Sequence, residues 1–319
     1  MKPKFLIEKP GAYPEITNFQ YHHDPLLLPA PSLSSSGAKT LLSKSAYHFW
    51  ATSPMNPNLP PRQPSEALIF GQLGHDMALF PNEWRNMYHV LPDGFTESHY
   101  NKWANAIKAR DFAISKGKTV VSRALFDRVI SCARAIGMDS MASSALRNGV
   151  NEITLAWQDK ETGVWLRCKP DFLPNAIIQG RQITAVSDLK FMAPEYCSPQ
   201  GFSGAIRRFG YHLSAAFYFE GIEHVYGNRP TYWNHVVIEK EEPFTVSNYP
   251  LPEEDIERGK FQMRKAIHKF AECLDRGTEA QHWPAYTSAE PIMVGLNTFA
   301  RNTIDQHGSE QDAAMINAG

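Results

Sequence analysis

The chain has 319 residues, of which 43% are hydrophobic and 12% aromatic, and its formal net charge is −1. This composition excludes a disordered chain, because the apolar side chains suffice for a packed core in one large domain or two small ones. The near-neutral charge also excludes general electrostatic attraction to nucleic acid, so any DNA contact must come from a local basic surface.

Membrane, secreted and metal-thiolate classes are also disfavoured. Charges or prolines interrupt every apolar stretch, so no segment is long enough to cross a bilayer, and the basic start of the chain has no signal-peptide apolar region behind it. The four cysteines are far apart without C-x-x-C spacing, which argues against a zinc ribbon or an iron–sulfur cluster. We therefore expect a soluble cytoplasmic protein with reduced thiols and no membrane partner.

The N-terminal quarter predicts irregular chain around one helix. Residues 1–31 are rich in proline and aromatic residues and are expected to form an extended arm. Serines 34–36 are N-cap candidates for a helix over 38–50. The prolines between 54 and 64 then mark a connector, since each of them disfavours a helix.

The next hundred residues predict helices. A stripe of apolar residues at spacings of three and four predicts a helix over 66–80, and its members are Phe70, Leu73, Met77 and Phe80. Further helices are expected over about 97–115 and 122–148, with a short extended run at 119–121 between them.

Strand periodicity begins after residue 150. The alternation in 152–157 and 164–168, joined by the turn-forming residues 159–163, predicts a β-hairpin. Further strands are expected over 183–190 and 233–239, with helices over 207–221 and 251–276. The polar tail beyond residue 288 is expected to be flexible. Helices around a central group of strands predict an α/β fold.

The chemically informative residues lie in Lys169-Pro170-Asp171 and Asp188-Leu189-Lys190. Because Asp188 and Lys190 are two apart on a predicted strand, their side chains point to the same face. Two carboxylates brought together repel unless a cation lies between them, and Mg²⁺ takes such oxygens together with water and phosphate. A neighbouring lysine can orient or deprotonate an attacking water. An isolated D-x-K is usually a solvated strand edge, and the preceding P-D, the apolar residues at 183–186 and the following helix favour a metal site instead.

The order of these motifs resembles that of the RecE-type (exonuclease VIII) exonucleases, within the RecB-like group of PD-(D/E)XK nucleases. The resemblance spans about residues 20–240 and rests on Tyr21–Pro25, Leu33–Gly37, Gly71–His75, Glu152, Lys169–Asp171, Asp188–Lys190 and Tyr211–Tyr218, followed by Glu220-Gly221. It implies a PD-(D/E)XK core, with a central mixed β-sheet flanked by helices, over residues 32–250. The arm 1–31 would precede this core, and a C-terminal helix and flexible tail would occupy 251–319.

The resemblance also implies roles for individual residues. Asp171, Asp188 and Lys190 would be catalytic, and His75, Asp171, Asp188 and the backbone carbonyl of Leu189 would bind Mg²⁺, for which Mn²⁺ can substitute. Helical spacing directs His75 away from the apolar stripe, with Gly71 one turn earlier leaving space for a close approach. Spacing alone would equally allow a surface or capping histidine.

Glu152 is a further candidate ligand. Strand alternation places it on the face opposite Ile153 and Leu155, where it would either reach the metal or face water. Both interpretations remain open on the sequence.

DNA-binding residues are expected on one face of the helix over 207–221, where side chains recur at steps of three and four. The predicted residues are Arg207, Arg208, Tyr211, Ser214 and Tyr218. RecB-like nucleases carry glutamine where this chain has Ser214, so either His212 or Arg208 compensates or activity is reduced. A tyrosine pair at this spacing is also ordinary packing.

The segment 34–39 is the candidate site for a terminal phosphate. Free N–H groups at a helix N-terminus bind anions, and Ser35, Ser36 and Lys39 can add donors. A plain helix cap explains the serines equally well. By contrast, Gly117-Lys118-Thr119 does not predict a P-loop, because Phe112 stands where the first glycine is needed.

The implied activity is digestion of the 5′ strand from a double-stranded DNA end, leaving a 3′ overhang for a single-strand annealing partner in phage or prophage recombination. Related enzymes form closed rings, so a homo-oligomer is expected. An endonuclease or flap nuclease on the same core is the first alternative. A non-catalytic DNA-binding or phage structural protein that kept the fold is the second, which Ser214 and the neutral charge favour and the intact Asp171, Asp188 and Lys190 disfavour.

Overall fold

The computed structural model describes residues 4–60, 64–96, 98, 100–181, 184–286, 291–298 and 300–305. The chain divides into two compact units, Met1–Trp283 and Pro284–Gly319. In the second unit residues 300–305 are helical. Most of the tail that was predicted to be flexible lies outside the described residues, and so does Ile183, the first residue of a predicted strand. All elements described below belong to the first unit.

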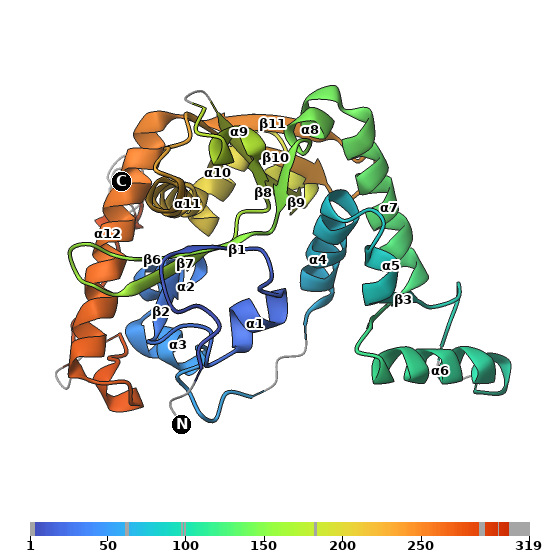
Figure 1. Ribbon diagram of the computed structural model, residues 1–319, viewed down its shortest axis with the longest axis horizontal. Coiled ribbons are helices and arrows are strands. Elements are labelled where there is room, and N and C mark those ends of the chain that lie inside the picture. The colour runs from blue at the N-terminus through green and yellow to red at the C-terminus, as the bar shows by residue number, and fades with distance from the viewer. Residues whose placement is uncertain are drawn as a thin grey trace, which may run out of the picture. The chain divides into compact units, whose positions relative to one another are not determined.

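Three sheets are present in the described part of the chain (Figure 1). The largest has the order β11-β10-β9-β8-β5 and comprises Val246–Leu251, Tyr232–Glu239, Ala185–Met192, Phe172–Pro174 and Gly149–Asn151. The second has the order β1-β6-β7-β2 and comprises Gly11–Tyr13, Thr154–Gln158, Trp165–Cys168 and Ser32–Ser34. The third pairs β3 (Tyr88–Val90) with β4 (Thr119–Val121). Parallel pairs, such as β9 with β10, occur beside antiparallel ones, which confirms the predicted mixed α/β architecture.

The helices are α1 (Asn18–His23), α2 (Ser35–Ser43), α3 (Ala46–Ala51), α4 (Glu66–Leu79), α5 (Trp84–Met87), α6 (Tyr100–Ser115), α7 (Arg123–Met138), α8 (Ser140–Ala145), α9 (Asn175–Ile178), α10 (Pro199–Phe209), α11 (Tyr211–Tyr226) and α12 (Glu253–Arg276). Short 3₁₀ turns lie at Pro194–Tyr196 and Ala280–His282.

The two faces of β9 and β10 are covered by different helices. Leu189 and Phe191 pack with residues of α4 and α7, whereas Met192 packs with Phe202 and other residues of α10. Because side chains alternate along a strand, Asp188 and Lys190 lie on the same face as Met192, toward α10 and α11. The two-residue spacing in the sequence predicted this shared face.

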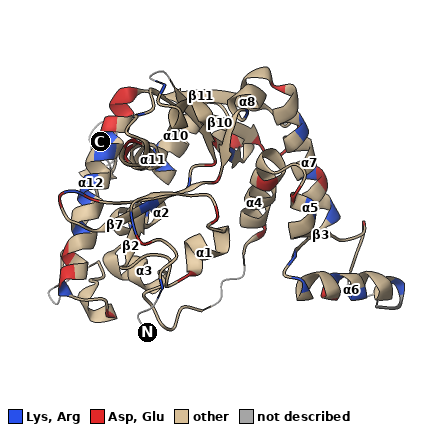
Figure 2. Ribbon diagram, viewed as in Figure 1, with Lys and Arg blue, Asp and Glu red and all other residues tan. Residues whose placement is uncertain are grey.

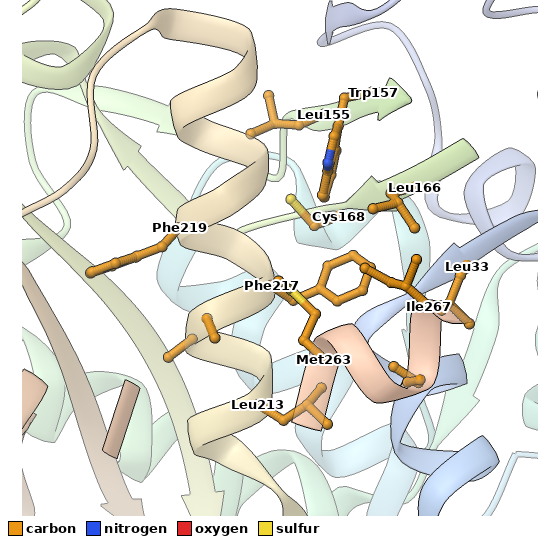
Figure 3. Close-up of a cluster of buried hydrophobic side chains, with 14 of the residues drawn as sticks. Leu33, Leu155, Trp157, Leu166, Cys168, Leu213, Phe217, Phe219, Met263 and Ile267 are labelled. Carbon is orange, nitrogen blue, oxygen red and sulfur yellow. The ribbon is translucent and has the colours of Figure 1, made fainter. Parts of the chain in front are cut away.

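The largest hydrophobic core surrounds α11. Leu213 and Phe217 of this helix pack with Met263 and Ile267 of α12 and with the β6–β7 hairpin, which contributes Leu155, Trp157, Leu166 and Cys168 (Figure 3). Lys and Arg alternate with Asp and Glu on the outer positions of α12, as the predicted amphipathic helix over 251–276 requires (Figure 2).

Three predicted helices are interrupted. The helix expected over 38–50 divides into α2 and α3 because Lys44 leaves the helical conformation and Ser45 caps α3. The helix expected over 122–148 divides at Asp139, whose side chain accepts a hydrogen bond from Ala142 N. The helix expected over 207–221 divides at Gly210, whose left-handed φ of 64° ends α10 and begins α11.

The predicted extended arm contains regular structure. Its β1 pairs with β6, and its helix α1 begins with a capping box at Thr17. Ile7, Ile16 and Leu27 are buried and form a separate core cluster with Trp165 of β7. The arm is ordered because these apolar residues cover the face of the second sheet that faces away from α11.

Candidate functional site

The chain crosses twice between the two larger sheets. On the first crossing it leaves β5, and Glu152 takes a left-handed φ of 46° before β6 begins. On the second, Lys169-Pro170-Asp171 carries it from β7 to β8. The candidate catalytic residues gather beside this second crossing.

Asp171 and Asp188 are brought together where β8 and β9 separate. The last antiparallel pair is Phe172 with Ser187, so one further step in the same register would place Asp171 opposite Asp188. Here the strand ladder stops, and the backbone N–H of Leu189 instead donates to Asp171 Oδ2 at 2.8 Å. Just before β8 begins, the side chain of Asp171 thus takes the place that a backbone carbonyl would occupy in a continued strand pair.

Lys190 forms an ion pair with Asp188. Its Nζ also donates to the carbonyl oxygen of Leu189 at 3.2 Å. The ammonium group therefore contacts the two oxygen groups of β9 that were predicted as metal ligands. The side chains of Asp188 and Lys190 are only 9% and 21% exposed, so this cluster is largely removed from bulk water.

His75 joins the cluster from α4, with its Nδ1 3.5 Å from Asp171 Oδ1. The close approach of α4 to β9 depends on Gly74, because a Cβ there would lie 2.6 Å from the Phe191 ring. The prediction that Gly71 provides this space is wrong, since a Cβ at Gly71 would have no atom within 4 Å. The role belongs to the glycine that faces the strand rather than to the one a turn earlier.

Burial and mutual attraction set the charges in this cluster. Burial alone would raise the pKa of Asp171, but His75, Lys190 and the Leu189 N–H outweigh it and lower that pKa to about 2. Burial raises the pKa of Asp188, with Lys190 opposing and Asp171 adding to the rise. Burial would lower the pKa values of His75 and Lys190, yet the neighbouring carboxylates raise both. The site thus has a marked affinity for positive charge.

The donor set fits a hard divalent cation that keeps water ligands. Among the described residues no three His, Cys, Asp or Glu groups lie close enough together to hold a metal on their own. Two carboxylates and one carbonyl would therefore have to be completed by water or phosphate oxygens, which is how Mg²⁺ is commonly held. The Lys190 ammonium shows that a cation fits between Asp188 and the Leu189 carbonyl.

Glu152 is not brought to these carboxylates by any contact in the described structure. Its Oε2 accepts a hydrogen bond from Asn18 Nδ2 of α1 at 2.7 Å, and its backbone N–H donates to Asp171 O at 3.0 Å. It lies at the crossing from β5, not within the strand alternation expected from the sequence. Glu152 therefore links α1 to the backbone of Asp171.

Asp76 is a buried carboxylate beside His75 that the sequence did not single out. The Tyr88 hydroxyl of β3 donates to its Oδ2 at 2.5 Å. Burial raises the pKa of Asp76 to about 6, with Tyr88 opposing and Glu152 adding to the rise. Its position in the predicted helix, next to Met77 of the apolar stripe, indicated burial but not the hydrogen bond to Tyr88.

Lys39 approaches the catalytic cluster rather than the N-terminus of its own helix. Its Nζ lies 5.9 Å from the centre of the Tyr211 ring, and Lys190 Nζ lies 5.2 Å from the same ring. Burial and the charge of Lys190 lower the pKa of Lys39 to about 8, despite the opposing effect of Asp188. Tyr211 thus faces two ammonium groups.

The serines before Lys39 form a cap. Ser34 Oγ accepts from Gly37 N at 3.3 Å and lies 3.0 Å from Ser36 Oγ. Ser35 is buried, while Ser36 is exposed and remains accessible to a ligand. These contacts establish the cap and leave the phosphate pocket a prediction.

The remaining predicted DNA-binding residues are divided between two helices. Arg207 and Arg208 are exposed on α10, and the break at Gly210 separates them from the face of α11. On α11, Tyr218 is partly buried, and its ring centre lies 5.4 Å from that of Trp233. Burial raises the pKa of Tyr218, as do the nearby charges of Tyr21, Asp188 and Asp171, so this tyrosine lies near the carboxylates.

Neither suggested substitute for the missing glutamine reaches the cluster by a contact in the described structure. His212 Nε2 lies 3.0 Å from Gln262 Oε1 of α12, and its Nδ1 lies 3.4 Å from Ile206 O. Arg208 lies over the Phe209 ring. Ser214 itself donates its backbone N–H to Gly210 O. On this side of the site Lys190 lies beside the Tyr211 ring, and Lys39 of α2 lies beside the same ring.

Lys and Arg residues recur on and beside α6 (Figure 2), and we call their exposed members the basic surface on α6. Lys102, Lys108 and Lys116 are exposed there, and Arg110 is paired with Asp111. Lys118 donates to Arg85 O at 3.0 Å, which ties this surface to α5.

No helix in the described ranges combines the length and apolarity needed to cross a membrane.

Two comparisons place this arrangement among known proteins. A family model described as "PDDEXK-like domain of unknown function (DUF3799)" matches residues 34–290. The fold is also similar to that in a crystal structure of a "putative exonuclease" from Eubacterium rectale, with a TM-score of 0.51 and 13% sequence identity over 85% of this chain and 92% of that chain. At this identity the likeness concerns the fold alone. No curated protein matches the chain.

Proposed function

The chain belongs to the family of PDDEXK-like domains, and from this premise we propose that it is a metal-dependent nuclease that hydrolyses DNA phosphodiester bonds. The observation that carries the proposal is the meeting of Asp171 and Asp188 at the start of β8, with Lys190 paired to Asp188. Two largely buried carboxylates beside an ammonium group suit a site where the carboxylates bind a cation and the ammonium group binds a phosphate.

PDDEXK-like nucleases generally use divalent metal ions. In this chain Asp171, Asp188 and the Leu189 carbonyl would hold the ion, with His75 at the side of Asp171. When bound, such an ion stabilises charge developing on the phosphate and lowers the pKa of a bound water. We propose Mg²⁺, with Mn²⁺ as a substitute, because oxygen atoms dominate the donor set.

The protein's own groups would position the reactants. The Lys190 ammonium would donate to the attacking water or to a phosphate oxygen, since it already donates to Leu189 O and is held by Asp188. The Leu189 N–H fixes Asp171 in place before any ligand binds, so little reorganisation is needed. Tyr211 and Lys39 would contact the phosphate on the α11 side.

The finer proposal is a 5′-to-3′ exonuclease on double-stranded DNA ends that leaves 3′ overhangs for recombination by strand annealing. The motif order resembling RecE-type enzymes supports it, and so does a helix cap with an accessible Ser36 on the helix that carries Lys39. A ring-shaped homo-oligomer and a single-strand annealing partner belong to the same proposal. The basic surface on α6 would hold the duplex through its phosphates.

The decisive test uses linear duplex labelled separately at each 5′ and each 3′ end, and a covalently closed circle of the same sequence. With Mg²⁺ we expect shortening of the linear substrate from its 5′ ends only, and no cleavage of the circle. Excess chelator or Lys190→Met should abolish the reaction, while Lys265→Met on the outer face of α12 should not. Cleavage of the circle would replace the exonuclease with an endonuclease, and no metal-dependent cleavage at all would remove the nuclease proposal.

A further inference from the structure

A cavity of about 300 Å³ lies apart from the candidate catalytic residues, none of which lines it. Its walls come from residues 24–25 and 27–32 of the N-terminal arm, from Phe49 and residues 53–55, and from Phe5, Arg167 and Thr278. Most of this lining is apolar, and Arg167 is the one basic residue in it. A mostly apolar cavity with a few polar groups is the usual form of a small-molecule site.

Arg167 reaches this cavity because of strand alternation in β7. Its neighbours Leu166 and Cys168 point into the main core, whereas Trp165 packs against the N-terminal arm. Arg167 shares the side of Trp165, and its guanidinium lies 5.0 Å from the centre of the Tyr21 ring. The cation is therefore held in a fixed position between the arm and the second sheet.

The guanidinium is incompletely satisfied. Nη1 donates to Ser32 Oγ, but Nε is buried without a hydrogen-bond partner. Within the described ranges, no ion pair joins Arg167 to a carboxylate. Asp24, the acid in the cavity wall, instead accepts the Leu26 N–H at 2.8 Å. Arg167 is partly buried and has no carboxylate partner among the described residues, so an anion in the cavity would supply the missing counter-charge.

The chemistry of the cavity favours a phosphate on an aromatic body. A guanidinium matches the geometry of a phosphate and can bind it through two parallel hydrogen bonds. The Ser32 hydroxyl lies beside it. The partly exposed Phe5 ring can contact a planar base, and Phe49, which packs on Phe270 and Trp283, forms a fixed part of the wall. The volume suits a single nucleotide and is too small for a duplex.

We infer that this cavity binds a nucleoside monophosphate, with its phosphate on Arg167 and its base against the apolar wall. The inference rests on the proposed nuclease function only for the source of the ligand. Hydrolysis of the P–O3′ bond by water leaves a 3′ hydroxyl on one side and a 5′ phosphate on the other, so terminal digestion would release nucleoside 5′-monophosphates. Arg167 lies in β7, four positions before Asp171 in the sequence.

The test is equilibrium binding of radiolabelled deoxythymidine 5′-monophosphate to the full chain in excess chelator, so that no metal contributes. We expect saturable binding at one site per chain, competition by the unlabelled nucleotide and none by deoxythymidine. Arg167→Gln should weaken binding by about tenfold or more, because a charge-assisted pair of hydrogen bonds is lost. Asp188→Asn and Lys39→Met, at the catalytic cluster, should leave the affinity unchanged.

Three results would overturn the inference: no saturable binding by the wild type, equal binding of deoxythymidine, or an affinity that Asp188→Asn changes and Arg167→Gln does not. Much stronger competition by a 5′-phosphorylated oligonucleotide than by the unlabelled nucleotide would assign the cavity to a strand end and so also overturn the inference. If Arg167→Gln does not fold, as judged by circular dichroism, Ser32→Ala provides the second variant and should weaken binding in the same direction. Failure of the nuclease proposal would leave these binding results unaffected, which keeps the two outcomes separate.

Discussion

The backbone N–H of Leu189 and the carboxylate of Asp171 are joined by a hydrogen bond of 2.8 Å beside the point where β8 begins. A strand that had continued pairing would have used this N–H for a backbone carbonyl. Asp171 is instead positioned by the backbone of the strand that carries Asp188 and Lys190. The geometry of the cluster therefore depends on the sheet itself rather than on a flexible loop.

Asp171→Asn should separate charge from position at this site. The asparagine carbonyl can still accept the Leu189 N–H, so we expect a folded protein, but the loss of negative charge should reduce nuclease activity by about 10²-fold or more. The measurement is the initial cleavage rate over a range of Mg²⁺ concentrations. Glu254→Gln on the exposed first turn of α12 is the control, and wild-type rates in Asp171→Asn would remove this residue from the site.

Lys39→Ala tests the phosphate contact. If Lys39 contacts a terminal phosphate, the wild type should digest 5′-phosphorylated duplex faster than 5′-hydroxyl duplex, because a monoester carries more negative charge than an internal diester. The variant should lose most of that preference and still cleave. Equal wild-type rates on both ends would show that α2 only carries a helix cap. An unchanged preference in the variant would direct attention to Arg207 and Arg208.

Gly74→Ala and Gly71→Ala form a matched pair on α4. A methyl group at residue 74 would lie 2.6–2.9 Å from atoms of the Phe191 ring, whereas one at residue 71 meets open space. We expect Gly74→Ala to lower the free energy of unfolding by about 1–3 kcal/mol and to reduce activity by displacing His75. Gly71→Ala should be neutral or stabilising by about 0.5–1 kcal/mol, because alanine favours the helix. Urea unfolding and cleavage rates would check both, and the reverse order of effects would contradict the packing of α4 on β9.

The Asp159–Arg264 ion pair predicts a stability change in acid. Burial would raise the pKa of Asp159, but hydrogen bonds from Arg264 and Thr162 outweigh it and lower that pKa to about 2. Since this value lies below that of an unfolded aspartate, about 3.9, the stabilisation is present above pH 4 and is lost as the pH falls toward 2. Asp159→Asn should unfold more easily at pH 6 and should lose part of the decline seen in the wild type below pH 4. Parallel pH profiles for both proteins would contradict the assignment.

The sequence predicted the centre of the site better than its surroundings. The spacing of Asp188 and Lys190 determines a shared strand face whatever the rest of the fold, and the motif order placed Asp171 beside them. The position of Lys39 could not be predicted in this way, because it depends on how α2 packs beside the start of α11. The same holds for Gly74, since helical spacing alone does not say which strand residue lies opposite.

Local patterns were also insufficient where tertiary contacts interrupt them. Gly210 ends one helix and begins the next within an otherwise continuous helical pattern. Arg207 therefore belongs to α10 and does not lie on the predicted face together with the residues of α11. Glu152 continues the strand alternation in sequence but occupies the crossing between two sheets, held by Asn18 of α1. Asn18 is 134 positions from Glu152, so no local pattern could show that contact. Gly210 is close to Arg207 in sequence, but the apolar pattern continues through it.

The passage from β7 to β8 also determines where this chain can change in length. Only Lys169 and Pro170 separate Cys168, the last residue of β7, from Asp171. One inserted residue here would shift the register and reverse which side chains face Asp188, because neighbouring positions on a strand point in opposite directions. The turn at 159–163, at the other end of the same hairpin, does not set the register of Asp171, although its Asp159 and Glu161 are paired with Arg264. A change in length there should therefore cost stability without moving the carboxylate, whereas one within two residues of Asp171 should abolish the site.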